Sequence, residues 1–93
     1  MSFTIQYHEV VVKEDIPKLA PTIQNQIKRA IEEKLVEFPE RFGKPLRRSL
    51  KGYRKLRVRD YRVIYRIEKN VVKIFVIQHR SVVYKQGGKR LAV

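Results

Sequence analysis

Five side chains in the C-terminal half of the sequence could together act on a phosphodiester. Lys55 and Arg62 lie in adjacent extended segments, and His79, Arg80 and Tyr84 come at and after the end of the next one. Amines and imidazoles can carry protons, and arginines can stabilise the charge of a phosphoryl transition state. These residue types suit RNA cleavage by attack of the RNA's own 2′-OH on the adjacent phosphorus. The substrate then supplies the nucleophile, and the protein supplies a base, a phosphate clamp and an acid.

A lysine that acts as the base has to be neutral before it can accept a proton. An ordinary lysine amine, with a pKa near 10.4, is neutral in only about one molecule in a thousand near pH 7.4. Lowering that pKa by about 3 units requires roughly 4 kcal/mol of differential destabilisation. Neighbouring cations can supply it, and we expect Arg57 and Arg62 to lie close to Lys55.

Other chemistries have less support in the sequence. His8 and His79 are too few and too isolated for a metal site, and no cysteine is available for a thiolate zinc site or a disulfide. Paired carboxylates are missing from the basic half. Gly87-Gly88 lies in a tail where we expect no helix to follow, so it does not predict a phosphate-binding loop. We therefore expect neither a metal nor a small-molecule cofactor.

Positive charge is concentrated in the same part of the chain. Of 22 Lys and Arg residues, 16 lie between Lys44 and Val93 with only two of the nine acids, so the net charge of +13 belongs to this half. The imbalance favours a negative partner, either nucleic acid or an acidic protein. A solvated surface explains any single cation about equally well, but it explains a one-sign cluster poorly. Four more residues of this region are candidates for RNA binding: Tyr53, Arg54, Arg57 and Arg59.

Length and composition predict one folded domain over residues 1–93, because 43% of the side chains are hydrophobic. The N-terminus has no signal-peptide pattern, and no apolar run approaches the length of a membrane span. We therefore expect a cytoplasmic protein without a membrane partner.

The first half of the chain predicts one strand and two helices. Residues 3–7 alternate between apolar and polar, as in a strand. Val10–Leu19 has helical spacing but contains Pro17, so either a short helix is capped by Asp15 or a longer helix kinks at the proline. Pro21 begins a clearer helix with an apolar side chain every fourth residue, which should end before the Phe38-Pro39 pair.

The second half predicts a loop, three strands and a short tail from Ser81. Phe42–Pro45 is typical of a loop, and short turns are expected at Arg59-Asp60 and at Lys69-Asn70, with positive φ at the asparagine. The order β-α-α-β-β-β predicts an α+β fold, a small curved antiparallel sheet of about four strands with two N-terminal helices packed on one face. The expected strands are Tyr53–Val58, Tyr61–Glu68 and Val71–His79.

Alternation along the first of these strands predicts which side chains share a face. Leu56 and Val58 mark the buried face. The opposite, open face should then carry Tyr53, Lys55, Arg57 and Arg59.

The run from Leu50 to Ile67, LKGYRKLRVRDYRVIYRI, resembles the central signature of the RelE/ParE toxin superfamily of prokaryotic type II toxin–antitoxin systems. His79-Arg80 followed by Val83-Tyr84 resembles the C-terminal motif of that superfamily. The order of elements matches too, so the resemblance covers essentially the whole chain. In the RelE branch it implies a toxin that enters the ribosomal A site, cleaves mRNA there, and is blocked by an antitoxin that wraps around it.

The resemblance also implies roles for individual residues. Lys55 matches the general base, Arg62 the phosphate-stabilising arginine and Arg80 the general acid. Tyr84 matches a C-terminal tyrosine that helps to orient the substrate. His79 matches a histidine that some ribonuclease relatives use for proton transfer.

Three functions remain open at this point. A RelE-like, ribosome-dependent mRNA endoribonuclease is favoured, with a cognate acidic antitoxin, the ribosome and mRNA as its partners. RelE carries a second lysine two residues before the base, where this chain has Tyr53. That departure keeps a ParE-like toxin that inhibits DNA gyrase as an alternative, and a non-catalytic RNA-binding module is the third.

Overall fold

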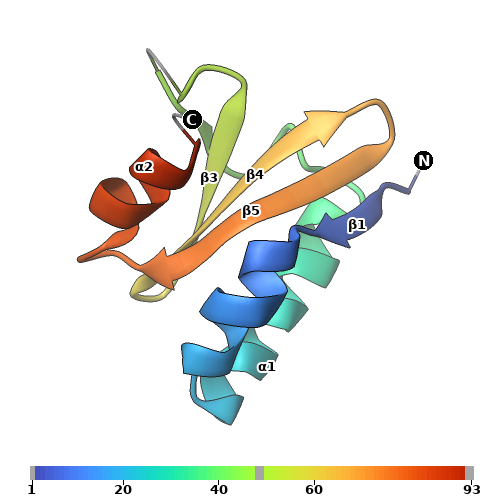
Figure 1. Ribbon diagram of the computed structural model, residues 1–93. Helices are drawn as coiled ribbons and strands as arrows, with labels where there is room; N and C mark the ends of the chain where they lie inside the picture. The colour runs from blue at the N-terminus through green and yellow to red at the C-terminus, as the bar shows by residue number, and fades with distance from the viewer. Residues whose placement is uncertain (1, 48–49, 92–93) are drawn as a thin grey trace.

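A computed structural model describes residues 2–47 and 50–91, which form an α+β fold around one open mixed sheet (Figure 1). The strands follow one another across the sheet in the order β1-β5-β4-β3-β2. Strand β1 runs parallel to β5, and the other neighbouring pairs are antiparallel. The five strands are β1 (Thr4–Tyr7), β2 (Lys44–Pro45), β3 (Tyr53–Val58), β4 (Tyr61–Glu68) and β5 (Val71–His79).

Three helical segments cover the sheet, two on one face and the third on the other (Figure 1). The N-terminal segment consists of η1 (Val11–Asp15) and η2 (Ile16–Lys18). The second consists of α1 (Pro21–Ala30) and its continuation η3 (Ile31–Leu35), and the third of η5 (Val83–Gly87) and α2 (Gly88–Leu91). Within the described ranges, none of these helices has the length and apolarity that crossing a bilayer requires.

The predicted fold class is confirmed, and so are the bounds of β3, β4 and β5. Of the two interpretations of the first helix, the longer one is right. The helix passes from π to 3-10 geometry at Ile16 and continues through Pro17. Asp15 does not cap it. The carboxylate of Asp15 is buried and accepts a hydrogen bond from the backbone N–H of Ile77 at 2.9 Å.

Three local predictions were wrong. Lys44–Pro45 forms a fifth strand paired with β3, rather than a loop. The tail is helical from Val83 to Leu91, so a short helix does follow Gly87-Gly88. In the β4–β5 turn the residue with positive φ is Lys69, at 57°, and not the asparagine that follows it.

The sheet is buried on both faces along β4 and β5. Val63 and Tyr65 pack with the two N-terminal helices, whereas Ile64 packs with Val83 of the C-terminal helix. A bulge interrupts the β4–β5 register, because Ile64 pairs with Val76 but Tyr65 pairs with Ile74. One residue of β5 is left without a partner, and the alternation of its side chains shifts by one from that point.

Tyr65 fastens the loop that precedes β2. Its side chain is completely buried, and its hydroxyl bonds to the carbonyl oxygens of Pro39, at 2.7 Å, and Phe42. Burial raises the pKa of Tyr65 above its ordinary value, so the neutral, donating form is favoured. Gly43 passes so close that a Cβ atom would lie 2.3 Å from this hydroxyl, and its φ of +81° also favours glycine.

Tyr65→Phe should lower the free energy of unfolding by about 1–3 kcal/mol, because buried carbonyl groups lose their donor. Urea denaturation followed by circular dichroism would measure the change. Tyr61→Phe is the matched control, since its hydroxyl makes no hydrogen bond within residues 2–47 and 50–91, and it should cost under about 0.5 kcal/mol. Equal losses in the two variants would show that the tether to Pro39 and Phe42 is not what stabilises this loop.

Candidate functional site

Four cations gather on the face of the sheet that lies opposite the N-terminal helices. Arg57 of β3 pairs with Arg62 of β4, and Lys55 of β3 pairs with Lys44 of β2, so these side chains share a face. Together with Gly43 and Leu56 they line a cavity of about 320 Å³, here called the basic groove. The structure thus brings together three of the residues that the sequence singles out, and it adds Lys44.

Lys44 was missed because its segment was interpreted as a loop. A two-residue strand has no periodicity that a sequence pattern can reveal, and only pairing with β3 sets its position. In that register the Lys44 and Lys55 side chains start from directly opposite positions. Like charges placed opposite each other in a sheet repel, so this arrangement favours a bound anion.

Tyr84 reaches the basic groove from the C-terminal helix. The Lys55 amine donates a hydrogen bond to the Tyr84 hydroxyl and lies 5.1 Å from the centre of its ring. Tyr84 is 53% exposed although it is aromatic, so a ligand in the groove can touch it. A lysine and a tyrosine that lie 29 residues apart therefore form one unit.

Arg62 and Arg80 are both held at the β3–β4 turn. Arg62 donates to the carbonyl oxygens of Arg59 and Tyr61, each at 2.9 Å. The backbone N–H of Arg80 donates to the Asp60 carbonyl at 2.8 Å, and its Nε lies 3.7 Å from the Asp60 carboxylate. Both side chains of this ion pair are more than 60% exposed. Such pairs contribute little to stability, so the Arg80 guanidinium is available to a phosphate.

His79 lies on the other face of the sheet. It pairs with Tyr61, and the two rings meet edge to face at 5.4 Å. Its Nδ1 lies 2.8 Å from the Ser81 hydroxyl, and the residue borders a cavity of about 200 Å³ with Asp15 and Leu19 of the N-terminal helix. The structure does not place His79 in the basic groove.

Arg54 and Arg59 also lie off the face that carries the groove. Arg54 donates to the carbonyl oxygens of Glu40 at 2.8 Å and Gly43 at 3.1 Å, so its guanidinium braces the loop before β2. Arg59 sits in the β3–β4 turn with a φ of 54° and borders a cavity beside α1. The expectation that Arg59 shares a face with Lys55 was therefore wrong.

Tyr53 is on the expected face but serves as a packing residue. Its ring meets Phe75 edge to face at 5.4 Å, and the Arg66 guanidinium lies 5.2 Å from the ring centre. Arg66 is paired with Glu68, whose carboxylate also binds Lys73 at 3.1 Å. These two hydrogen-bonded cations hold the pKa of Glu68 below its ordinary value. Glu68 thus offsets part of the charge of these two cations, whereas within residues 2–47 and 50–91 no carboxylate pairs with the four cations of the basic groove.

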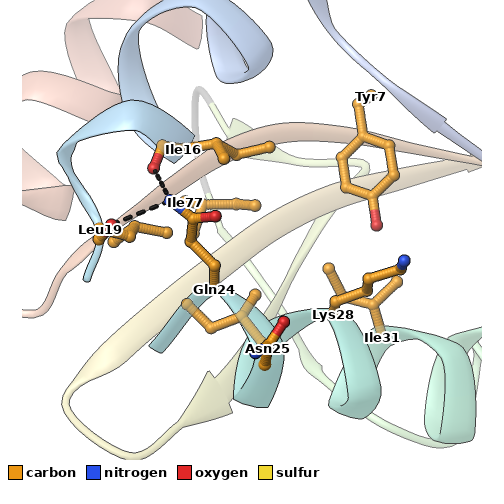
Figure 2. Close-up of a pocket in the computed structure, with 9 residues that line it drawn as sticks. Tyr7, Ile16, Leu19, Gln24, Asn25, Lys28, Ile31 and Ile77 are labelled. Atoms are coloured by element: carbon orange, nitrogen blue, oxygen red, sulfur yellow. Dashed lines mark hydrogen bonds between the residues drawn. The ribbon is translucent and has the colours of Figure 1, made fainter. Parts of the chain in front are cut away.

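A different cavity, of about 350 Å³, lies between the N-terminal helices and the sheet (Figure 2). Ile16, Leu19 and Ile77 make much of its wall apolar. Figure 2 shows the Gln24 amide of α1 pointing toward the end of the N-terminal helical segment, where it donates to the carbonyl oxygens of Ile16 at 3.0 Å and Leu19 at 2.9 Å. With its one amine, Lys28, this cavity lacks a phosphate clamp, so the basic groove is the candidate site.

The family model described as ParE toxin of type II toxin-antitoxin system, parDE, matches residues 9–84 of the chain. The chain belongs to the RelE/ParE family of type II toxins. It is similar to toxin RelG of Mycobacterium tuberculosis, with 34% identity over 88 residues that cover 92% of this chain and 100% of that protein. It is also similar to toxin RelE of the same organism, with 42% identity over 55 residues and 57% of each chain.

Solved structures of relatives have the same fold. The RelBE2 toxin–antitoxin complex of Mycobacterium tuberculosis contains a chain that matches with a TM-score of 0.80 and 33% identity, over 86% of this toxin and 100% of that chain. A free E. coli RelE with two arginines changed to alanine matches with a TM-score of 0.73 and 26% identity, over 97% and 98% of the two chains. The five-stranded mixed sheet with its helices is thus the RelE fold.

Lys44→Ala should weaken the binding of single-stranded RNA to this toxin and reduce the dependence of log Kd on log salt by about 0.7 to 1, because one phosphate contact is lost. Fluorescence anisotropy over a salt series would measure both quantities, with a 2′-O-methyl RNA that cannot be cleaved.

Lys28→Ala is the matched control for this change. It removes the same charge from α1, on the opposite face of the sheet, where Lys28 lies 4.0 Å from Glu32. It should alter neither the affinity nor the salt dependence. Equal effects of the two variants would show that overall charge, rather than the basic groove, binds RNA.

Proposed function

We propose that this toxin is a RelE-like endoribonuclease that cuts mRNA on the ribosome, by attack of the 2′-OH on the adjacent phosphorus. The observation that carries the proposal is the basic groove, where one lysine amine in contact with Tyr84 shares a cavity with two arginines and a second lysine. A strand of RNA in the groove would have its phosphate oxygens among these four cations. Binding would relieve the repulsion between the cations.

The proposed reaction gives each group one task. Lys55, in its neutral amine form, takes the proton from the 2′-OH, the 2′-oxygen bonds to phosphorus, and the bond from phosphorus to the 5′-oxygen breaks. Arg57 and Arg62 donate hydrogen bonds to the non-bridging oxygens, which gain negative charge in the transition state. Arg80 does not line the groove, but it lies at the turn to which Arg62 is hydrogen-bonded, and on this proposal it would supply a proton to the leaving 5′-oxygen. The products are a 2′,3′-cyclic phosphate and a free 5′-OH. We assign no step to His79, because it lies on the other face.

An acidic antitoxin is the proposed protein partner. The matching chain of Mycobacterium tuberculosis was solved in a toxin–antitoxin complex, and the E. coli RelE mutant was solved with a peptide of its antitoxin. A net charge of +13 gives this toxin a strong attraction for an acidic chain. The ribosome and mRNA would be its targets, which implies action in the cytoplasm.

The second candidate function is that of a ParE-like toxin, which would inhibit DNA gyrase. Two observations favour it: the matching family model is that of ParE toxins, and Tyr53 packs on Phe75 where RelE has a second lysine. On this proposal the cations would bind a protein or DNA surface, and no bond would be cut by the toxin.

Lys55→Ala and Arg62→Ala should each reduce cleavage of ribosome-bound mRNA by about 100-fold or more, because one variant removes the base and the other a charge that stabilises the transition state. Primer extension on a reporter mRNA, after induction in cells or in a translating extract, would show the cuts. Thermal unfolding should change little in Lys55→Ala and modestly in Arg62→Ala, which loses two hydrogen bonds to carbonyl oxygens of the turn.

The control variant is Lys28→Ala, which should cut like the unaltered toxin. Intact mRNA with normal protein synthesis would contradict the proposal. A supercoiling assay with purified gyrase decides between the two candidates, since inhibition without ribosomes supports the ParE-like function.

A further inference from the structure

A buried ion pair joins the two ends of this chain. The Asp15 side chain is only 2% exposed, and its two carboxylate oxygens accept hydrogen bonds from the Arg90 guanidinium at 2.8 and 3.0 Å. The same guanidinium donates to the Phe75 carbonyl at 2.9 Å, while Asp15 accepts from the Ile77 N–H at 2.9 Å. The hydrogen bonds to the Asp15 carboxylate, together with its negative charge, raise the pKa of Arg90 above its ordinary value. None of these groups belongs to the basic groove.

The ion pair satisfies backbone groups of β5 that have no neighbouring strand to pair with. Strand β1 pairs with β5 only as far as Tyr7 and Ile74, so the Phe75 carbonyl and the Ile77 N–H lie beyond its end. Arg90 supplies the donor and Asp15 the acceptor that the missing strand would have supplied. Each new partner belongs to a different helix, so this edge can be satisfied only when both helices are docked.

The C-terminal helix therefore has two anchors. Val83 is completely buried against Ile64 and Val76 at its beginning. Near its end, Arg90 is held by Asp15 and Leu91 packs against the same apolar cluster as Val83. The two anchors are seven residues apart, about 10 Å along a helix. The apolar contacts of Val83 and Leu91 have no directional requirement, whereas the bidentate pairing of Arg90 with Asp15 fixes the direction in which the side chains of the helix point.

We propose that Asp15 and Arg90 are positioning residues, which set the contact between Tyr84 and the amine of Lys55. Tyr84 follows the first anchor directly and is largely exposed, so its own packing does not hold it over the basic groove. The second anchor fixes the rotation of the helix, and hence whether the Tyr84 hydroxyl reaches the lysine. This proposal rests on the proposed cleavage by Lys55, and it adds two residues that act through Tyr84.

The energetics of buried ion pairs favour a positioning role over a stabilising one. Taking two charges out of water costs about as much as their attraction returns, so apolar side chains of similar size often stabilise a fold equally well. A guanidinium and a carboxylate differ from apolar groups in demanding one bidentate geometry. The intact pair of Arg90 and Asp15 therefore constrains the direction of the helix more than it adds to stability, but removing Arg90 alone leaves a buried carboxylate unpaired and also destabilises the fold.

The test compares Arg90→Gln with Arg90→Lys and with Lys89→Gln, an exposed neighbour on the same helix. Arg90→Gln should lower the single-turnover rate of mRNA cleavage at saturating toxin about ten- to hundredfold, because a misplaced group is costly in catalysis. The toxin concentration that gives half the maximal rate should change less than about twofold. Arg90→Lys should restore part of the rate, and Lys89→Gln should leave it unchanged.

Two further measurements separate positioning from loss of folding. In the Tyr84→Phe background, Arg90→Gln should cause no further loss of rate, because both changes act on the same contact. Asp15→Asn, which keeps an acceptor for the Ile77 N–H, should lower the rate in the same direction as Arg90→Gln. Full, multiplicative losses in the double variant would overturn the proposal.

A readout without catalysis keeps the two proposals distinguishable. An NMR cross-peak between the Tyr84 ring and the Lys55 side chain should be present in the unaltered toxin and lost in Arg90→Gln, while amide exchange speeds up over residues 83–91 but not in β3–β5. If the unaltered toxin does not cut RNA, the proposed function fails but this result still tests the contact. A cross-peak that survives in Arg90→Gln would overturn the positioning role.

Discussion

Burial on both faces of β4 and β5 is the interaction on which the rest of this structure depends. Val63, Tyr65, Val72, Ile74 and Val76 are all completely buried. Each fully buried side chain of this size contributes roughly 1.5–3 kcal/mol, and these contributions oppose the repulsion among the cations on one face. The basic groove lies at β2, β3 and the first residues of β4, beside the part of the sheet that is covered on both faces.

The bulge in β5 decides how the two faces are divided. Without it, Ile74 and Val76 would point the same way; with it, Ile74 packs under the N-terminal helices and Val76 under the C-terminal helix. The shift also turns Ile77 and His79 toward the N-terminal helices. The bulge in β5 therefore places apolar side chains under the C-terminal helix. It also places His79 on the face opposite to the one that carries the cations.

The parts of the fold that depend on local patterns were predictable from the sequence. The alternation in β3–β5 and the turns between them gave the bounds of those strands, and the same alternation placed Lys55 and Arg57 on one face. What failed depends on distant contacts. The segment from Val83 to Leu91 contains two glycines and is too short to be a stable helix alone, so its helicity comes from docking at both ends. A pattern within the segment could not reveal this, nor that Asp15 binds the far end of the chain.

The candidate site shows the same division between local and distant causes. Strand alternation brings Arg57 and Arg62 together, but the groove is complete only when β2 adds Lys44 and the C-terminal helix adds Tyr84. Both additions lie on segments that tertiary contacts hold in place. Hydrogen bonds from Tyr65 hold the loop before β2, and the ion pair with Asp15 holds the C-terminal helix at Arg90. A cluster of like charges built in this way is poorly stabilised until an anion enters it. An RNA phosphate and an antitoxin carboxylate would relieve the same repulsion, so the two proposed partners would compete for one groove, and occupation by the antitoxin would by itself exclude the substrate.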